Sequence, residues 1–120
     1  MIVAHGGLAR EYLAAVEHVV GPQGGIRAVT IEEDHDRVAK QMEIARAADE
    51  VDSGDGVVIV TDLFGGSPSN LSMPACVAGK RRILYGANLP MLVKLAKLRH
   101  LDVGTAAEAA AEAGRKYIDC

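Results

Sequence analysis

The fold class is decided by the stretch Val57-Val58-Ile59-Val60-Thr61-Asp62-Leu63-Phe64-Gly65-Gly66-Ser67-Pro68. Its first four residues form an unbroken β-branched run, and a strand of this kind is buried on both faces, which favours a parallel sheet. The glycines and the Ser-Pro pair then predict a turn into a helix over residues 69–77, with Ser67 as its N-cap and Pro68 as its first residue. A buried strand that leads directly into a helix is the unit from which α/β sheets are built.

The rest of the chain repeats this alternation in both directions. The predicted strands are short apolar runs at residues 1–4, 26–31, 57–60 and 82–85. The predicted helices carry apolar residues at spacings of three and four. The second of them is capped by Asp34 or Asp36 and ends near Ser53, and the fourth is opened by Asn88 and Pro90 and runs over residues 88–98. The other three cover residues 8–20, 69–77 and 105–117.

Strict alternation of strand and helix implies right-handed crossovers and a doubly wound α/β structure. We expect a mainly parallel, four-stranded sheet of order 2-1-3-4 with helices on both faces, and a short antiparallel edge strand at the C-terminus as an option. The 120 residues fit a single domain spanning 1–120. We find no internal repeat or linker.

Composition excludes several classes of function. Hydrophobic residues make up 49% of the chain and charged residues 24%, as in ordinary globular proteins. The net charge is −3 with no basic stripe, which argues against nucleic acid or an anionic membrane as a direct partner. No apolar run approaches the roughly 20 residues that span a bilayer, and the start has no signal-peptide pattern, so we expect a cytoplasmic protein.

The two cysteines, Cys76 and Cys120, show no CxxC spacing and fit neither a disulfide framework nor a zinc site. We interpret Cys76 as a small buried hydrophobic residue. No metal ligands are predicted from the rest of the chain.

Chemistry-bearing residues gather at one edge of the predicted sheet. In the order 2-1-3-4 the winding reverses between the first and third strands, which end in His5 and Asp62. Neighbouring strands lie about 4.8 Å apart, so the carboxylate can accept a hydrogen bond from one imidazole nitrogen and leave the other free as a nucleophile. Gly65, Gly66 and Ser67 lead into a helix N-terminus, where free N–H groups favour an anion.

Each of these residues also has an ordinary explanation: His5 as a turn residue, Asp62 as a turn former, and Gly-Gly-Ser-Pro as a plain helix start. Their coincidence at one sheet edge favours a phosphohistidine site instead. The other histidines are interpreted as solvated groups or helix-end cations, namely His18, His35 and His100.

Three motifs, in this order and over nearly the whole chain, resemble the IIA component of the mannose (mannose/fructose/sorbose) family of the bacterial sugar phosphotransferase system. They are Val3-Ala4-His5-Gly6 with Leu8-Ala9, then Asp62 through Asn70, then Gly86-Ala87-Asn88-Leu89-Pro90-Met91. The resemblance implies a phosphotransferase that accepts a phosphoryl group on His5 from the histidine protein HPr and passes it to a IIB protein. Asp62 would orient His5, and the loop through Ser67 would contact the phosphoryl group.

The same resemblance implies no cofactor and only indirect contact with a membrane, through a permease complex. It also implies a homodimer, often formed by exchange of a last strand. Because the printed chain ends soon after Lys116-Tyr117-Ile118, we expect that strand to be very short or missing. The motif around Asn88 is expected at the rim of the site without a chemical role.

Three other readings stay open at the level of sequence. The first keeps the phosphorylation but makes it a regulatory signal read by a binding partner, without a dedicated sugar permease. The second is the related domain that serves dihydroxyacetone kinase, which usually continues into further phosphocarrier domains. The third is a flavodoxin-like or nucleotide-binding module with a structural His5, against which the loop after the first strand lacks GxGxxG or a P-loop lysine. The sugar and the identity of the acceptor are not fixed by these residues.

Overall fold

The structure is a computed structural model that describes residues 1–76 and 80–120. Its sheet has four strands, β1 (Ile2–His5), β2 (Ala28–Ile31), β3 (Val57–Thr61) and β4 (Arg81–Leu84). They are ordered β2-β1-β3-β4, and all three pairings are parallel. The predicted doubly wound α/β fold is therefore confirmed, including its strand order.

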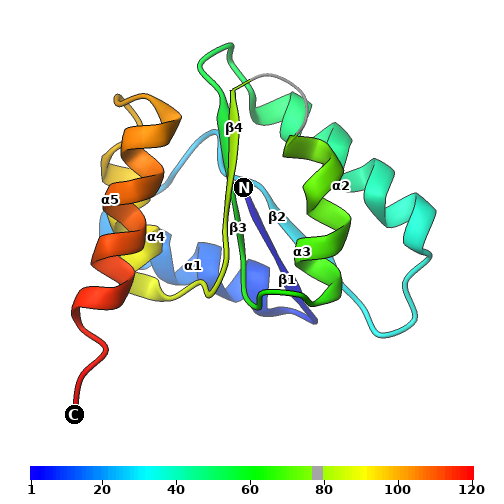
Figure 1. Ribbon diagram of the computed structural model, residues 1–120, viewed down its shortest axis with the longest axis horizontal. Coiled ribbons are helices and arrows are strands. Elements are labelled where there is room, and N and C mark those ends of the chain that lie inside the picture. The colour runs from blue at the N-terminus through cyan, green and yellow to red at the C-terminus, as the bar shows by residue number, and fades with distance from the viewer. Residues whose placement is uncertain (77–79) are drawn as a thin grey trace.

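Helices cover both faces of this sheet (Figure 1). One face carries α2 (Arg37–Val51) and α3 (Ser67–Ser72), the latter continued by the 3₁₀ turn η1 (Met73–Cys76). The other face carries α1 (Leu8–Val20), α4 (Leu89–Lys97) and α5 (Val103–Lys116). The turns that follow β1 and β3 lie at the same edge of the sheet, which is the carboxyl edge of its strands.

Two apolar clusters form because successive side chains of a strand point to opposite faces. Val3 packs in the cluster beneath α2 and α3, whereas Ile2 and Ala4 pack in the cluster beneath α1, α4 and α5. The β3 strand contributes to both, with Ile59 on the first side and Val60 on the second, and both are at most 1% exposed. The strands are thus buried on both faces, as their β-branched sequences predict.

Side-chain caps fix where three of the helices begin. Asp36 accepts a hydrogen bond from Ala39 N at 3.0 Å and so starts α2, one of the two caps predicted. Asn88 starts α4 in the same way, as predicted. Asp102 accepts from Thr105 N at 3.0 Å, which begins α5 earlier than the predicted position 105.

The prediction that Ser67 is the N-cap of α3 is wrong. Gly66 is the N-cap, with extended backbone (φ −82°, ψ 174°), and Ser67 is the first helical residue. The Ser69 hydroxyl binds the preceding loop instead, since it accepts from Gly65 N at 3.0 Å and donates to Gly66 O at 2.9 Å. The helix also ends at Ser72 and tightens into η1, where Pro74 supplies no N–H. Val77, the predicted end, lies outside the described residues.

Smaller differences concern the strands and the tail. β2 begins at Ala28 rather than at residue 26, and β4 lies one residue earlier than predicted because Arg81 pairs in register with Val57. Residues 117–120 follow α5 without forming a strand. Among the helices of the described residues, none is both long and apolar enough to cross a bilayer.

Candidate functional site

His5 and Asp62 meet at the carboxyl edge of the sheet. His5 is the last residue of β1, and Asp62 follows the last residue of β3. One carboxylate oxygen of Asp62, Oδ2, accepts two hydrogen bonds from His5: one from its backbone N–H at 3.0 Å and one at its ring nitrogen Nδ1, 2.8 Å away. The Asp62 side chain is only 11% exposed and that of His5 is 48% exposed, so the ring faces solvent while its anchor is buried.

This geometry determines the tautomer of the imidazole. An ionised carboxylate can only accept hydrogen bonds, so Nδ1 of His5 must carry the proton. The other ring nitrogen, Nε2, then has a free lone pair, and the nearby negative charge stabilises any positive charge that develops on the ring. The second oxygen of Asp62, Oδ1, is buried and finds no partner in the described part of the chain. Within residues 1–76 and 80–120, the hydrogen bonds that this carboxylate accepts therefore all come from His5.

The loop after Asp62 approaches the ring at the nitrogen that is free. A Cβ atom built on Gly66 would lie 3.0 Å from Cε1 of His5, tighter than ordinary van der Waals contact, and 3.4 Å from Nε2, at the lower limit of such contact. Gly65, the preceding residue, has a φ of +82°, which side-chain-bearing residues rarely adopt. Both glycines are thus required by the backbone, the first for the turn and the second for the close approach.

Ser67 stands at the start of α3 beside this approach and is half-buried. Its backbone N–H belongs to the first turn of a helix, where donors lack partners within the helix. The predicted group of His5, Asp62, Gly65, Gly66 and Ser67 therefore lies within one short stretch of surface, and His5 contacts both Asp62 and Gly66 directly.

Tyr12 is a further residue of this region, and the sequence did not single it out as a site residue. Its hydroxyl donates to the carbonyl oxygen of Ala87 at 2.9 Å and so ties α1 to the loop before α4. Partial burial and the negative charge of Asp62 both raise the pKa of the Tyr12 hydroxyl. The sequence gives one signal for the position of Tyr12 near the site. Tyr12 lies one turn into the helix that follows His5.

Two apolar side chains beside the site face solvent. Leu63 is 57% exposed and Phe64 is 75% exposed, directly after Asp62. The Phe64 ring stands edge-on to Tyr85, with ring centres 4.9 Å apart. The only phenylalanine of the chain, placed in a glycine-rich turn, was the signal for this surface.

Asn88 has a structural role at the edge of the site. Besides capping α4, its side-chain Nδ2 donates to Gly114 O at 2.8 Å and so ties α4 to α5. Cys76 is half-buried against the core rather than fully buried, and burial raises the pKa of its thiol. Within residues 1–76 and 80–120, no cluster of three or more His, Cys, Asp or Glu side chains is placed to hold a metal ion.

The other histidines lie away from His5 in the chain and differ in their contacts. His18 is exposed in the last turn of α1, where a cation is favourable, and His100 is exposed just after α4. His35 lies in the turn before α2, and its Nδ1 atom is 2.7 Å from Glu32 O.

Comparison with known protein families identifies the chain. The family EIIA-man, described as the PTS (phosphotransferase system) fructose IIA component, matches residues 1–113. The chain belongs to this family. It is accordingly a phosphocarrier component of the sugar phosphotransferase system and takes part in phosphoryl transfer. The resemblance carried by the three sequence motifs is confirmed.

Solved structures share the fold. The EIIA component of the phosphotransferase system from Streptococcus agalactiae has a TM-score of 0.89 at 23% identity, and the match covers 99% of this chain and 93% of that one. The mannose/sorbose-specific IIA subunit from Enterococcus faecalis has a TM-score of 0.89 at 24% identity, covering 99% and 90%. The PTS IIA protein associated with the fucose utilization operon from Streptococcus pneumoniae has a TM-score of 0.73 at 26% identity, covering 92% and 86%.

Proposed function

We propose that Nε2 of His5 carries the phosphoryl group, which it receives from the phosphohistidine of HPr and passes to a IIB protein. The observation that supports this most directly is the double hydrogen bond from His5 to Asp62 Oδ2, since its ring bond favours the tautomer with the proton on Nδ1 and a free lone pair on Nε2. The proposed donor and acceptor place the reaction in the cytoplasm.

The proposed step exchanges one phosphorus–nitrogen bond for another. The Nε2 lone pair of His5 attacks the phosphorus atom of the donor phosphohistidine; the donor's P–N bond breaks, and its electron pair returns to the donor ring. His5 keeps its Nδ1 proton throughout, so its ring gains positive charge, which the Asp62 carboxylate stabilises. The transfer onward to the acceptor repeats these events with His5 as the leaving group. No oxidant, metal ion or external base is needed for this balance.

The loop beside Nε2 suits the transferred group. Gly66 leaves the space next to Nε2 and Cε1 open because it has no side chain. The backbone N–H groups at the start of α3, that of Ser67 among them, favour the negative charge of the phosphoryl oxygens. We propose that Gly65, Gly66 and Ser67 cradle the group, while His5 and Asp62 perform the transfer.

The experiment that tests this function incubates the chain with phosphoenolpyruvate, enzyme I and HPr, and measures intact mass. We expect one phosphoryl adduct that is stable in base and labile in acid. His5→Ala should abolish the adduct, whereas the control His18→Ala, at an exposed histidine of α1, should retain it. Loss of the adduct in His18→Ala, or its survival in His5→Ala, would refute the assignment.

A second variant separates the role of Asp62 from that of His5. Asp62→Asn keeps the shape of the side chain but removes its charge, and we expect phosphorylation by phospho-HPr to slow by about 10²-fold. Phosphorus NMR should place the group on Nε2 in the wild type. A phosphoryl group on Nδ1, or an unchanged rate in Asp62→Asn, would contradict the proposed geometry.

We also infer a homodimer. Tyr117 and Ile118, which follow α5, are 69% and 75% exposed, and large apolar side chains in adjacent positions favour cover by another surface. Light scattering should give twice the monomer mass for the wild type, and Ile118→Asp should weaken the dimer. A monomeric wild type at every concentration would exclude it.

A further inference from the structure

The loop that approaches Nε2 of His5 is held in place by two side chains of α3. The hydroxyl of Ser69 accepts a hydrogen bond from Gly65 N at 3.0 Å and donates one to Gly66 O at 2.9 Å. The side-chain Nδ2 of Asn70 donates to Gly65 O at 3.2 Å. Three side-chain hydrogen bonds therefore fix two successive glycines, which have more backbone freedom than any other residue type.

Ser69 makes one bond more than a serine in a helix commonly does. Serine hydroxyls inside helices often donate to a carbonyl oxygen three or four residues earlier. Ser72 of the same helix shows this ordinary bond, since its hydroxyl donates to Pro68 O at 2.6 Å. Ser69 makes the corresponding bond to Gly66 O and also accepts from Gly65 N, which lies in the loop before α3. Because Ser69 is only 1% exposed, solvent water does not compete for these two bonds.

The bonds from α3 set the direction of the peptide groups beside His5. In a trans peptide the C=O and N–H groups point in opposite directions. The carbonyl oxygens of Gly65 and Gly66 are both bonded to side chains of α3, so the N–H groups of the same two peptides point away from those side chains. Gly66 is also the residue whose added Cβ would meet the ring of His5. The position of Gly66 relative to Nε2 therefore depends on how firmly α3 holds the loop.

We propose that Ser69 is a positioning residue for phosphoryl transfer, which holds Gly66 against Nε2 of His5 so that the loop can bind the transferred group. This inference rests on the proposed function of His5, and Ser69 acts on that residue only through the loop. Without the Ser69 hydroxyl, the loop would keep the bond from Asn70, whose side chain is exposed to competing water. The hydrogen bonds between His5 and Asp62 do not involve Ser69 and should persist.

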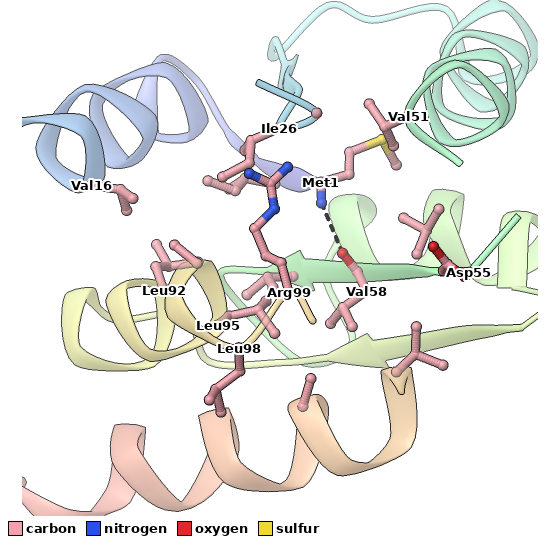
Figure 2. A pocket seen from close by; sticks show the side chains of 18 of the residues that line it. Met1, Val16, Ile26, Val51, Asp55, Val58, Leu92, Leu95, Leu98 and Arg99 are labelled. Atoms are coloured by element: carbon pink, nitrogen blue, oxygen red, sulfur yellow. Dashed lines mark hydrogen bonds between the residues drawn. The ribbon is translucent and has the colours of Figure 1, made fainter. Parts of the chain in front are cut away.

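Amide hydrogen exchange tests the positioning contact without any phosphoryl donor. In the wild type the Gly65 amide should be protected about tenfold or more, because Ser69 accepts its hydrogen bond, and Ser69→Ala should remove most of that protection. Val16 of α1 serves as the internal reference, since it is 2% exposed in the interior beside α4 (Figure 2) and its amide exchanges only on larger opening. Equal acceleration at Gly65 and Val16 would indicate a global loss of stability and overturn the proposal. An unprotected Gly65 amide in the wild type would overturn it even if Ser69→Ala failed to fold.

Two matched variants then test the effect on transfer. Ser69→Ala and the control Ser72→Ala each remove one hydroxyl from a residue of α3 that is at most 1% exposed, but only Ser69 is bonded to the loop beside His5. Each variant is mixed with phospho-HPr, and the phosphorylated fraction is measured by intact mass over time and at equilibrium. Ser69→Ala should lower the equilibrium constant for transfer about fivefold, because a loosened loop binds the phosphoryl group less well.

The rates give a second readout from the same mixtures. Ser69→Ala should lower the transfer rate at saturating phospho-HPr about tenfold and leave KM for phospho-HPr unchanged within about twofold, because the docking surface is intact. Ser72→Ala should change the rate and the equilibrium constant by less than about twofold. A residue that only stabilises α3 would not shift the equilibrium constant, so this shift distinguishes positioning from stability.

The outcomes separate this inference from the proposed function. If the wild type is phosphorylated and Ser69→Ala matches Ser72→Ala in both rate and equilibrium constant, the role of Ser69 is refuted while His5 remains the carrier. A change in KM alone would refute it as well, since the loss would then lie in docking. If the wild type accepts no phosphoryl group although its Gly65 amide is protected, the proposed function fails, and the role of Ser69 in transfer fails with it.

Discussion

Replacing Gly66 by alanine tests the close approach between the loop and His5. The new Cβ atom would lie 3.0 Å from Cε1 and 3.4 Å from Nε2 of His5, whereas ordinary contacts begin at about 3.4 Å. The backbone of Gly66 (φ −82°, ψ 174°) is allowed for alanine, so the loop has no reason to rearrange. The imidazole ring must therefore retreat by several tenths of an ångström, and the methyl group takes the space beside Nε2.

The expected cost is kinetic. A misplacement of 1 Å in a reacting group lowers a rate by about 10²-fold, so a smaller shift combined with a partly blocked nitrogen should slow phosphorylation of His5 by about 10- to 100-fold. Stability should change by less than about 1 kcal/mol, because alanine is a poorer N-cap than glycine but also lowers the entropy of the unfolded chain.

The matched control is Gly7→Ala. Gly7 is also a helix N-cap with negative φ (−86°), it lies two positions from His5, and a Cβ there meets no atom within 4 Å. Rapid-quench measurement of transfer from phospho-HPr, together with urea unfolding, separates the two effects. If Gly66→Ala accepts the phosphoryl group as fast as Gly7→Ala does, the contact between Gly66 and Nε2 has no bearing on transfer and the reasoning is wrong.

Three further outcomes follow from other contacts. Arg81→Lys should lower the free energy of unfolding by about 2 kcal/mol, because the buried guanidinium group binds Ala75 O and two aspartates. The control Arg82→Lys, at the exposed neighbouring position, should change it by less than about 0.5 kcal/mol. Equal effects of the two substitutions in urea unfolding would contradict this reasoning. Cys76 should react with a thiol reagent far more slowly than Cys120, since burial raises the pKa of the Cys76 thiol and Cys120 is exposed; equal rates would refute it. Hydrogen bonds from Thr30 and Lys40 lower the pKa of Glu32 to about 2, so its contribution to stability is present above pH 4.5 and lost as the pH falls through about 2. Glu32→Gln should flatten that part of the stability curve measured by thermal unfolding, and an unchanged curve would exclude the effect.

The order of the elements was predictable because each has a strong local signal. The β-branched run of β3 and the three-and-four spacing of α1 leave few alternatives, and α1 occupies the predicted residues 8–20. Doubly wound topology then places the ends of β1 and β3 side by side, so His5 and Asp62 could be paired from sequence alone. That both hydrogen bonds end on one oxygen was beyond sequence, since it depends on the side-chain rotamer of Asp62.

The errors have local physical causes. The start of α3 was misplaced because Ser67 and Ser69 are equally suitable hydrogen-bonding residues, and only the folded loop shows that Ser69 binds it. The fourth strand was predicted to begin at Arg82 rather than at Arg81, because the sequence does not show that aspartates of α2 and of the turn after it neutralise Arg81 where it is buried. The contact of Tyr12 was not predictable, because the three-and-four spacing of apolar residues in a helix cannot distinguish a buried ring from one whose hydroxyl reaches a distant carbonyl oxygen.

The two bonds from His5 to a single oxygen of Asp62 restrict the rotation of the imidazole ring. The ring and the backbone N–H of His5 are both bonded to Asp62 Oδ2, so the accessible nitrogen, Nε2, has one preferred direction relative to β1. On the proposed function, donor and acceptor must each bring phosphorus to that same point from the same side, and they cannot be bound together. Transfer would then follow ping-pong kinetics, with unphosphorylated HPr competing against the acceptor. The surfaces of HPr and of the acceptor would both have to fit the fixed position of Nε2.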